Sequence, residues 1–243
     1  MTLHEFLRRF ITVHKCAGCG EILDYANCEQ AFCPKCRLAW NAAKTVSCPT
    51  CFAVAVECEC MPKQLSRAGA LCHRKLFFYD GENSATPQMK LIYNLKHKKS
   101  RRITEFASRE LLTYIRAETE VLGEGAQIVI TNVPRSKKSL VLYGFDQSGM
   151  LARRLGELLH VEYADLFRKT HGSAQKELGA TARLANAKKT LRLVKNADIK
   201  GKYVILIDDI VTSGASMSVC VKALMGKGAV GVMCASVASK NKM

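Results

Sequence analysis

The sequence predicts an α/β protein in which helices flank a parallel sheet and a small cysteine-rich module precedes the sheet. Residues 203–207 form an almost wholly apolar, β-branched run, which is typical of a central parallel strand covered on both faces. Residues 216–225 then repeat apolar side chains at helical spacing, and 229–237 is another apolar run, so the pattern predicts one strand-helix-strand unit. Ten of the twelve cysteines lie between Cys16 and Cys72, so that segment has its own chemistry.

The composition is that of a globular chain. Hydrophobic residues make up 48% and charged residues 24%, enough to bury a sizeable core. At about 150 residues per domain, the length leaves room for one core domain and a small module, which we place at 73–243 and 1–72. No apolar run approaches the roughly 18 residues that cross a bilayer, and the first ten residues lack a signal-peptide apolar region. We therefore expect a cytoplasmic protein without membrane insertion.

The elements of the larger domain follow from hydrophobic spacing. Apolar residues at helical intervals predict helices over 89–95, 103–115 and 151–159. A short β-branched strand at 128–130 precedes Val133-Pro134, where the proline marks the chain leaving the strand. We expect the tail at 239–243 to fray.

The cysteines fall into paired knuckles. In a chain without a signal peptide, such pairs indicate metal before disulfide, and four thiolates from two knuckles can surround zinc tetrahedrally. We expect a first zinc site on Cys16, Cys19, Cys33 and Cys36, and a second on Cys48, Cys51, Cys58 and Cys60, although the Cys58-x-Cys60 gap is unusual. His14, Cys28, Cys72 and His73 are alternative ligands. With every position filled by protein, the zinc is expected to be structural.

A formal net charge of +16 favours polyanionic partners, either nucleic acid or phosphorylated metabolites, although a solvated basic surface explains it as well. In the module, Trp40 and Phe52 lie among basic residues and could stack on a single strand. The alternative interpretation is that these aromatics belong to a core. The module could bind DNA, bind a protein, or only stabilise the N-terminal region.

The residues directly after the 203–207 strand carry the candidate chemistry. Ligands of parallel sheets bind beyond the carboxyl ends of the strands, and Asp208 and Asp209 occupy that place. Two adjacent carboxylates there make sense if they face hydroxyls or a divalent cation. Thr212, Ser213 and Gly214 then open a helix with exposed N–H groups that suit a phosphate. The alternative is a polar loop in which Ser216 only caps the helix.

The whole string 204–216 resembles the signature of the type I phosphoribosyltransferases. That resemblance implies that Asp208 and Asp209 hold the ribose hydroxyls of phosphoribosyl pyrophosphate. It implies a 5′-phosphate cradle made of Thr212, Ser213, Gly214, Ala215 and Ser216. Mg²⁺ would be carried mainly by oxygens of the ligand itself.

Further blocks resemble the ComF family, the competence-associated phosphoribosyltransferase-like proteins of bacteria. They are 91–97, Val133-Pro134-Arg135, 144–148 and Gln175-x2-Leu178-x4-Arg183-x2-Asn186. The resemblance implies that Lys96 and Arg135 lie near the pyrophosphate and that 175–186 closes over it. The family usually has Arg-Gly-Phe-Asn-Gln where this chain has Tyr143-Gly144-Phe145-Asp146-Gln147, which weakens any charge contact there.

This resemblance implies a phosphoribosyltransferase associated with natural competence and single-stranded DNA uptake, with a helicase-like competence protein as a possible partner. Enzyme status stays open because no residue identifies the acceptor. One alternative is a non-catalytic adaptor that senses nucleotides and recruits DNA or a helicase. Another is a DNA-binding zinc-finger protein whose α/β portion is only a scaffold.

Overall fold

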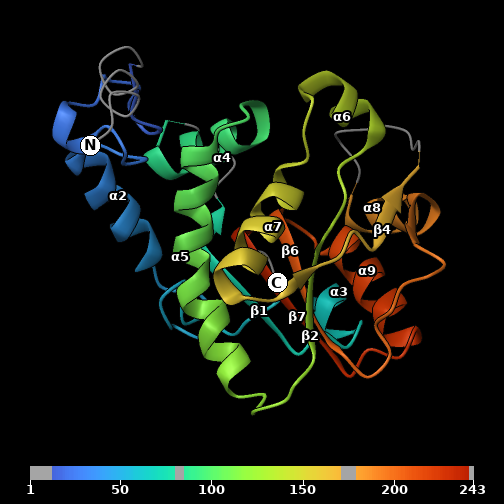
Figure 1. Cartoon of the computed structure of the whole chain (residues 1–243). Helices are drawn as coiled ribbons and strands as arrows, with labels where there is room; N and C mark the ends of the chain where they lie inside the picture. Colours follow the sequence, from blue (N-terminus) through green and yellow to red (C-terminus); the bar gives the residue numbers. More distant parts are fainter. Residues whose placement is uncertain (1–12, 80–84, 171–178, 241–243) are drawn as a thin grey trace.

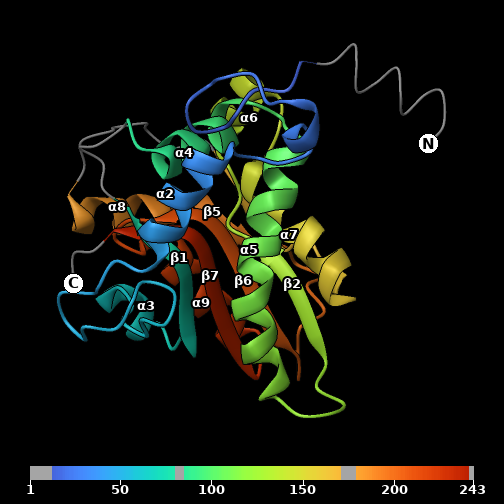
Figure 2. The ribbon, with the colours of Figure 1, turned by 90° about the vertical axis from the view of Figure 1, so that its left-hand side faces the viewer.

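A computed structural model describes residues 13–79, 85–170 and 179–240. Its main sheet has five strands, all parallel, in the order β1-β7-β6-β2-β3 (Figures 1 and 2). The strands are β1 (Cys72–Tyr79), β7 (Gly231–Lys240), β6 (Tyr203–Val211), β2 (Ile128–Asn132) and β3 (Glu162–Tyr163). A separate antiparallel pair joins β4 (Phe167–Lys169) to β5 (Leu191–Leu193). The predicted parallel sheet with flanking helices is confirmed.

Strand β6 is the middle strand, and its sequence explains that place. Ile205 and Ile207 pack into the hydrophobic cluster on one face of the sheet, and Val204 and Leu206 into the cluster on the other. Successive side chains of a strand point to opposite faces, so a strand buried on both faces reads as a continuous apolar run. The interpretation of 203–207 as a central strand is confirmed.

Helices cover both faces. On one side lie α2 (Pro34–Lys44), α4 (Pro87–His97), α5 (Arg101–Glu120) and α7 (Gln147–Leu159). The other side carries α3 (Lys63–Ser66), α8 (Ala180–Thr190) and α9 (Ala215–Gly226) (Figure 1). The remaining short elements are η1 (Tyr25–Asn27) and α6 (Lys137–Tyr143). The predicted helices are all present, and each extends beyond its apolar repeat. Side-chain caps set the start of two of them: Ser100 caps α5, and Asp146 Oδ1 accepts a hydrogen bond from the Gly149 N–H of α7 at 3.1 Å.

Three strands run further than predicted, and β2 does so by two residues, to Asn132. Strand β6 continues through Asp208 and Asp209 to Val211 because its partner β7 keeps pairing with it as far as Ser239. Ser239 and Lys240, expected to fray, lie in β7 and pair with β1, whereas 241–243 lie outside the described residues. The acids therefore lie near the end of a strand that still pairs with β7 on one side, not in a free loop, whereas the pairing with β2 ends at Ile207.

The cysteine-rich segment packs onto the sheet. Trp40 of α2 is fully buried, with its ring 5.3 Å from that of Phe77 in β1 and 5.2 Å from that of Phe106 in α5. Its indole N–H donates to Glu110, which also pairs with Arg37 and Lys44. Trp40 as a stacking group for DNA is therefore wrong, and its interpretation as a core aromatic is confirmed. The domain boundary at 72/73 stays a prediction, and no described helix is long and apolar enough to span a membrane.

Candidate functional site

The candidate site lies at the carboxyl ends of β6 and β2, where the chain turns toward α9 and α6. Gly214 is the N-cap of α9 and has a φ of +72°, a left-handed conformation that glycine adopts without steric cost. The turn lets α9 begin at Ala215 with its N-terminal N–H groups at the end of β6. A helix N-terminus carries partial positive charge, so this end of α9 favours an anion.

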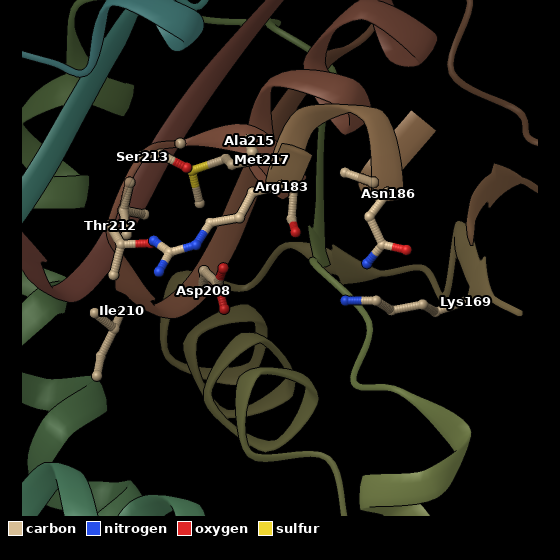
Figure 3. A pocket seen from close by; sticks show the side chains of 13 residues that line it. Lys169, Arg183, Asn186, Asp208, Ile210, Thr212, Ser213, Ala215 and Met217 are labelled. Carbon is tan, nitrogen blue, oxygen red and sulfur yellow. The ribbon is translucent and has the colours of Figure 1, made fainter. Parts of the chain in front are cut away.

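A cavity of about 150 Å³ lies in front of this turn (Figure 3). All five residues predicted to cradle a phosphate line it: Thr212, Ser213, Gly214, Ala215 and Ser216. The Ser213 hydroxyl is buried and has no hydrogen-bond partner within the described chain. A buried hydroxyl without a partner is uncommon in folded proteins and is satisfied if an oxyanion enters the cavity.

Two cations reach the same cavity from other elements. Arg183 of α8 donates to the Thr212 hydroxyl at 3.3 Å, and Figure 3 shows its guanidinium between Thr212 and Asp208. Lys169 of β4 extends toward Asp208 from the opposite side (Figure 3). Arg183 belongs to a segment for which the family resemblance implied closure, but its place beside Thr212 did not follow from the sequence. No sequence pattern indicated Lys169. Gln175 and Leu178, which belong to the segment expected to close over the pyrophosphate, lie outside the described residues.

The two aspartates are held by different partners. Buried Asp209 accepts the Gln147 amide at 3.0 Å and the Ile210 N–H at 2.7 Å, and its carboxylate lies 3.6 Å from Lys96 Nζ. Asp208 accepts the Ser148 hydroxyl at 3.0 Å. Burial, and then the neighbouring negative charge of Asp209, raise the pKa of Asp208 well above its usual range. A cation or ligand hydroxyls at this position would offset that unfavourable charge.

A second cavity of about 280 Å³ adjoins the first and shares Asp208, Lys169 and Ser216 with it. The residues that distinguish it come from the end of α4, the β2–α6 turn and the start of α7: Lys96, Val133, Pro134, Arg135, Ser136, Ser139, Gln147 and Ser148, together with Asp209. The two cavities thus meet at Asp208, one against the N-terminus of α9 and the other beside Lys96.

Arg135 lies next to Lys96 but is engaged by the main chain. Its guanidinium donates to the Lys96 carbonyl at 2.8 Å and to the Phe145 carbonyl at 3.3 Å, and it lies 4.3 Å from the centre of the Tyr143 ring. Asp146 Oδ2 accepts the Arg135 N–H at 3.0 Å. Tyr143 and Asp146, which depart from the family pattern, therefore hold Arg135 in place, and Arg135 ties the end of α4 to the β2–α6 turn.

Two groups of four cysteines are arranged so that each could bind a metal ion. They are Cys16, Cys19, Cys33 and Cys36, and Cys48, Cys51, Cys58 and Cys60, and within each group all sulfur atoms lie within 4.8 Å of one another. Tetrahedral zinc with sulfur at about 2.3 Å spaces its sulfurs about 3.8 Å apart. The Cys19–Cys33 sulfurs are 3.8 Å apart and those of Cys51 and Cys58 are 3.6 Å apart, which fits. Cys28, Cys72, His14 and His73 belong to neither group in the described chain.

Each group contains a thiol whose pKa is lowered, which favours its thiolate form. Burial alone would raise the pKa of Cys16, but N–H groups of Cys33, Cys19 and Gly18 outweigh it and bring the pKa to about 7. Cys48 also reaches a pKa of about 7, since N–H groups of Cys51 and Thr50 outweigh its burial. Thiolates are the form that binds metal, so these main-chain donors favour a metal site.

The second group is anchored to the sheet by a buried cation. Lys75 of β1 is only 2% exposed, and its ammonium donates to the Cys58 carbonyl at 2.7 Å and to the Cys60 carbonyl at 3.0 Å. Burial raises the pKa of the Cys58 thiol, and the positive charge of Lys75 opposes that rise. A zinc ion with four thiolates carries net negative charge, which this ammonium would offset.

The comparisons with known proteins agree with this geometry. Residues 137–243 match the phosphoribosyl transferase domain family. The chain is 29% identical over 150 residues to the DNA utilization protein YhgH of Escherichia coli K12, covering 61% of this chain and 65% of that protein. It is 29% identical over 147 residues to YhgH of Shigella flexneri, covering 60% and 64%. The match thus spans less than two thirds of the curated relatives.

Among solved structures, similarity extends to a phosphoribosylpyrophosphate synthetase from Mycobacterium smegmatis, 19% identical, covering 58% of this chain and 38% of that chain, with a TM-score of 0.36. A hypoxanthine phosphoribosyltransferase from Staphylococcus aureus is 14% identical, covering 57% and 68%, with a TM-score of 0.35.

Proposed function

We propose that this protein binds phosphoribosyl pyrophosphate with Mg²⁺ at 208–216. Two similarities support the proposal: residues 137–243 match the phosphoribosyl transferase domain family, and the chain is similar to DNA utilization proteins. The observation that carries the proposal is the pair of cavities that meet at Asp208. One cavity faces the N-terminus of α9, and the other faces Lys96. A ligand with a phosphate at one end, a diphosphate at the other and a pentose between them matches this layout.

Each part of the ligand is assigned to its own residues. The 5′-phosphate accepts hydrogen bonds from the N–H groups of 212–216 and from the Ser213 hydroxyl, and the Arg183 guanidinium attracts its negative charge. The ribose hydroxyls donate hydrogen bonds to Asp208 and Asp209. These bonds offset part of the repulsion between the two carboxylates. Lys96 neutralises the pyrophosphate, and Arg135 positions Lys96 through its carbonyl.

The oxygen-rich surroundings of the two acids fit Mg²⁺, which prefers oxygen ligands and usually retains several from its substrate. Asp208 and Asp209 are the carboxylates beside which a ligand-borne Mg²⁺ would lie. When bound, the ion would neutralise negative charge on the pyrophosphate. Its charge would also counteract the cause of the raised pKa of Asp208.

We further propose that the site supports group transfer. A nucleophile forms a bond to the anomeric carbon while the bond from that carbon to the pyrophosphate oxygen breaks, and pyrophosphate leaves with the electron pair. Positive charge from Lys96 stabilises the departing pyrophosphate in the transition state. The proton of the nucleophile goes to solvent or to the released pyrophosphate.

Calorimetric titration with phosphoribosyl pyrophosphate and Mg²⁺ tests the proposal. The paired substitution Asp208→Asn and Asp209→Asn removes the charged acceptors and keeps their size, so we expect affinity to fall at least about 100-fold, given about 1.5–3 kcal/mol for each charge-assisted bond. Asp198→Asn, at an exposed carboxylate, is the control and should bind like the wild type. Equal affinity in the paired variant and the control would overturn the assignment.

A second candidate function is a non-catalytic adaptor that uses the same site to sense a nucleotide and recruits single-stranded DNA or a helicase-like competence protein. The names of the curated relatives, which refer to DNA utilization, favour a DNA link. Pyrophosphate release, measured with bases, amines and DNA as acceptors, separates the two candidates. Steady release with one acceptor excludes the adaptor, and binding without release for the whole panel favours it.

For the cysteine groups we propose structural zinc, one ion in each. All four ligands come from protein in both groups, so no coordination position is open for catalysis. Thiols of this kind persist in a reducing compartment, which supports a cytoplasmic location. Zinc released by a thiol-blocking reagent should amount to two ions per chain, one for each group.

A further inference from the structure

Two large cavities flank the first cysteine group. One, of about 810 Å³, lies between 13–20 and the α4–α5 corner, and the other, of about 650 Å³, continues along the first half of α5. They share His14, Arg101 and Arg102, so they form one trench. We call it the α5 trench. Among the residues that the structure describes, two acids line it, Glu29 and Glu105, against seven cations: Lys15, Lys90, Lys98, Arg101, Arg102, Arg109 and Arg154.

The charge in this trench is only partly neutralised. Glu105 pairs with both Arg109 and Arg154. Arg102 is engaged by the Gln30 and Lys15 carbonyls. The remaining cations, Lys15, Lys90, Lys98 and Arg101, are exposed and form no ion pair within the described ranges. Arg101 also begins α5, whose N-terminus adds partial positive charge.

Aromatic rings stand at the end of the trench that is nearer the candidate site. Tyr93 is 58% exposed, and its ring stacks on that of His97 with centroids 4.1 Å apart. The His97 ring in turn meets the edge of Tyr143 at 5.0 Å. Tyr93 lines the trench, while Lys96, next to His97 in the chain, lines the cavity beside Asp209. The trench and the sugar-phosphate site are therefore neighbours along α4.

We propose that the α5 trench binds a single-stranded nucleic acid, with a base stacked on Tyr93 and phosphates on Lys90, Lys98 and Arg101. Unpaired cations around a recess supply phosphate affinity, and an exposed, pre-stacked aromatic ring gives an unpaired base a platform. A duplex keeps its bases stacked on one another and has no use for Tyr93. The proposed function includes a link to single-stranded DNA, and this inference names the surface that would bind it. Binding at the α5 trench does not require an occupied sugar-phosphate site.

Fluorescence anisotropy with a labelled oligodeoxythymidylate of about 20 nucleotides, long enough for one such site, tests the inference. The paired substitution Lys98→Ala and Arg101→Ala should lower affinity about tenfold or more. It should also reduce the slope of log affinity against log salt by about 1.4, because each phosphate that the protein no longer neutralises reduces that slope by about 0.7. Tyr93→Ala should lower affinity about tenfold without changing the slope, and Tyr93→Phe should restore it.

The matched control is the paired substitution Lys222→Ala and Lys227→Ala, which removes the same charge from exposed positions of α9 and just after it. It should leave affinity within about twofold, because non-specific attraction to net charge is screened at physiological salt. If this control and the trench variant lose affinity equally, or if Tyr93→Ala binds like the wild type, the inference is overturned. Duplex DNA bound as tightly as the single strand would also contradict it.

One further variant separates this inference from the proposed function. The Asp208→Asn and Asp209→Asn protein should still bind the oligonucleotide at wild-type affinity, because neither acid lines the trench. Loss of phosphoribosyl pyrophosphate binding with retained oligonucleotide binding supports both. Retained phosphoribosyl pyrophosphate binding in that variant rejects the sugar-phosphate site alone, and loss of oligonucleotide binding in it rejects the trench.

Discussion

Pro62 lies against Gly214: a Cβ built at Gly214 would stand 3.1 Å from Pro62 Cβ and 3.2 Å from Leu65 Cγ. Pro62 follows the last ligand of the second cysteine group by two residues, and Leu65 is in α3. The segment that leaves the second cysteine group therefore packs directly on the turn proposed to hold the 5′-phosphate. This contact gives the cysteine-rich module a physical connection to the site.

The first prediction concerns Gly214→Ala. The substitution forces a side chain into the left-handed region, which costs about 1–2 kcal/mol, and presses it against Pro62 and Leu65. We expect urea unfolding to report that loss and calorimetry to report weaker binding of phosphoribosyl pyrophosphate. Gly226→Ala, in the same helix with open space around its Cβ, should match the wild type in both measurements. Identical behaviour of the two variants would refute the packing argument.

The second prediction distinguishes the two cysteine groups by the part of the candidate site that each one contacts. Cys51→Ser and Cys19→Ser each replace an exposed cysteine that we propose as a zinc ligand, so each protein should lose one zinc ion. Only the second group leads into the segment that packs on Gly214, so Cys51→Ser should weaken binding of ribose 5-phosphate several-fold.

The first group contacts α4 instead, since the Asn94 amide donates to the Ala17 carbonyl at 3.0 Å. Cys19→Ser should therefore leave ribose 5-phosphate binding unchanged and weaken only ligands that reach Lys96, such as phosphoribosyl pyrophosphate. Zinc analysis and calorimetry with both ligands check this pattern. Equal effects of the two variants on ribose 5-phosphate would contradict it.

The third prediction is a pH dependence at Asp208. Folding raises the pKa of this carboxyl, so the native state holds its proton more tightly than the unfolded chain. The free energy of unfolding should therefore fall as pH rises from the unfolded pKa of about 4 through the higher native pKa. Asp208→Asn has no carboxyl to ionise, so it does not lose this stability. Without ligand at neutral pH, its melting temperature should exceed that of the wild type by about 2–4 °C for each kcal/mol gained. Below about pH 4 the two melting temperatures should converge.

Thermal unfolding over a pH series, with Asp198→Asn as the exposed control, measures the effect. The control should follow the wild-type curve throughout. A gap between Asp208→Asn and the wild type that is constant with pH would show that the effect does not come from titration of Asp208.

The fourth prediction concerns Arg183. Removal of one charge-assisted hydrogen bond costs about 1.5–3 kcal/mol, so Arg183→Ala should lower affinity for phosphoribosyl pyrophosphate about 10- to 100-fold. Because this side chain is exposed and bonds only Thr212 in the described chain, stability should change little. Arg192→Ala, on β5 outside both cavities, is the control for affinity. Calorimetry and urea unfolding of both variants test the assignment.

Much of this fold could be predicted because the deciding signals are local. A strand buried on both faces is visible as a continuous apolar run, as in 203–207, and four pairs of cysteines indicate two groups of metal ligands. The residues of 208–216 could also be placed together, since they are contiguous and a helix must begin after Gly214. Only the end of the strand is predicted too early, because the continued pairing of β6 with β7 depends on a partner segment far along the chain.

The parts that escaped prediction depend on tertiary contacts. Nothing local distinguishes Trp40 as a core residue from an exposed stacking group, because its burial depends on Phe77 and Phe106. Lys169 reaches the site because β4 pairs with β5, not because of its neighbours in sequence. The contact between Pro62 and Gly214 joins segments that share no pattern, so only the folded chain reveals it.

The most direct test of the central claim is a crystal structure of the protein with phosphoribosyl pyrophosphate and Mg²⁺. The account predicts the 5′-phosphate against the N–H groups of 212–216, the ribose hydroxyls within hydrogen-bonding distance of Asp208 and Asp209, and the pyrophosphate beside Lys96. A ligand bound elsewhere, with the turn before α9 closed and its acids unengaged, would contradict it.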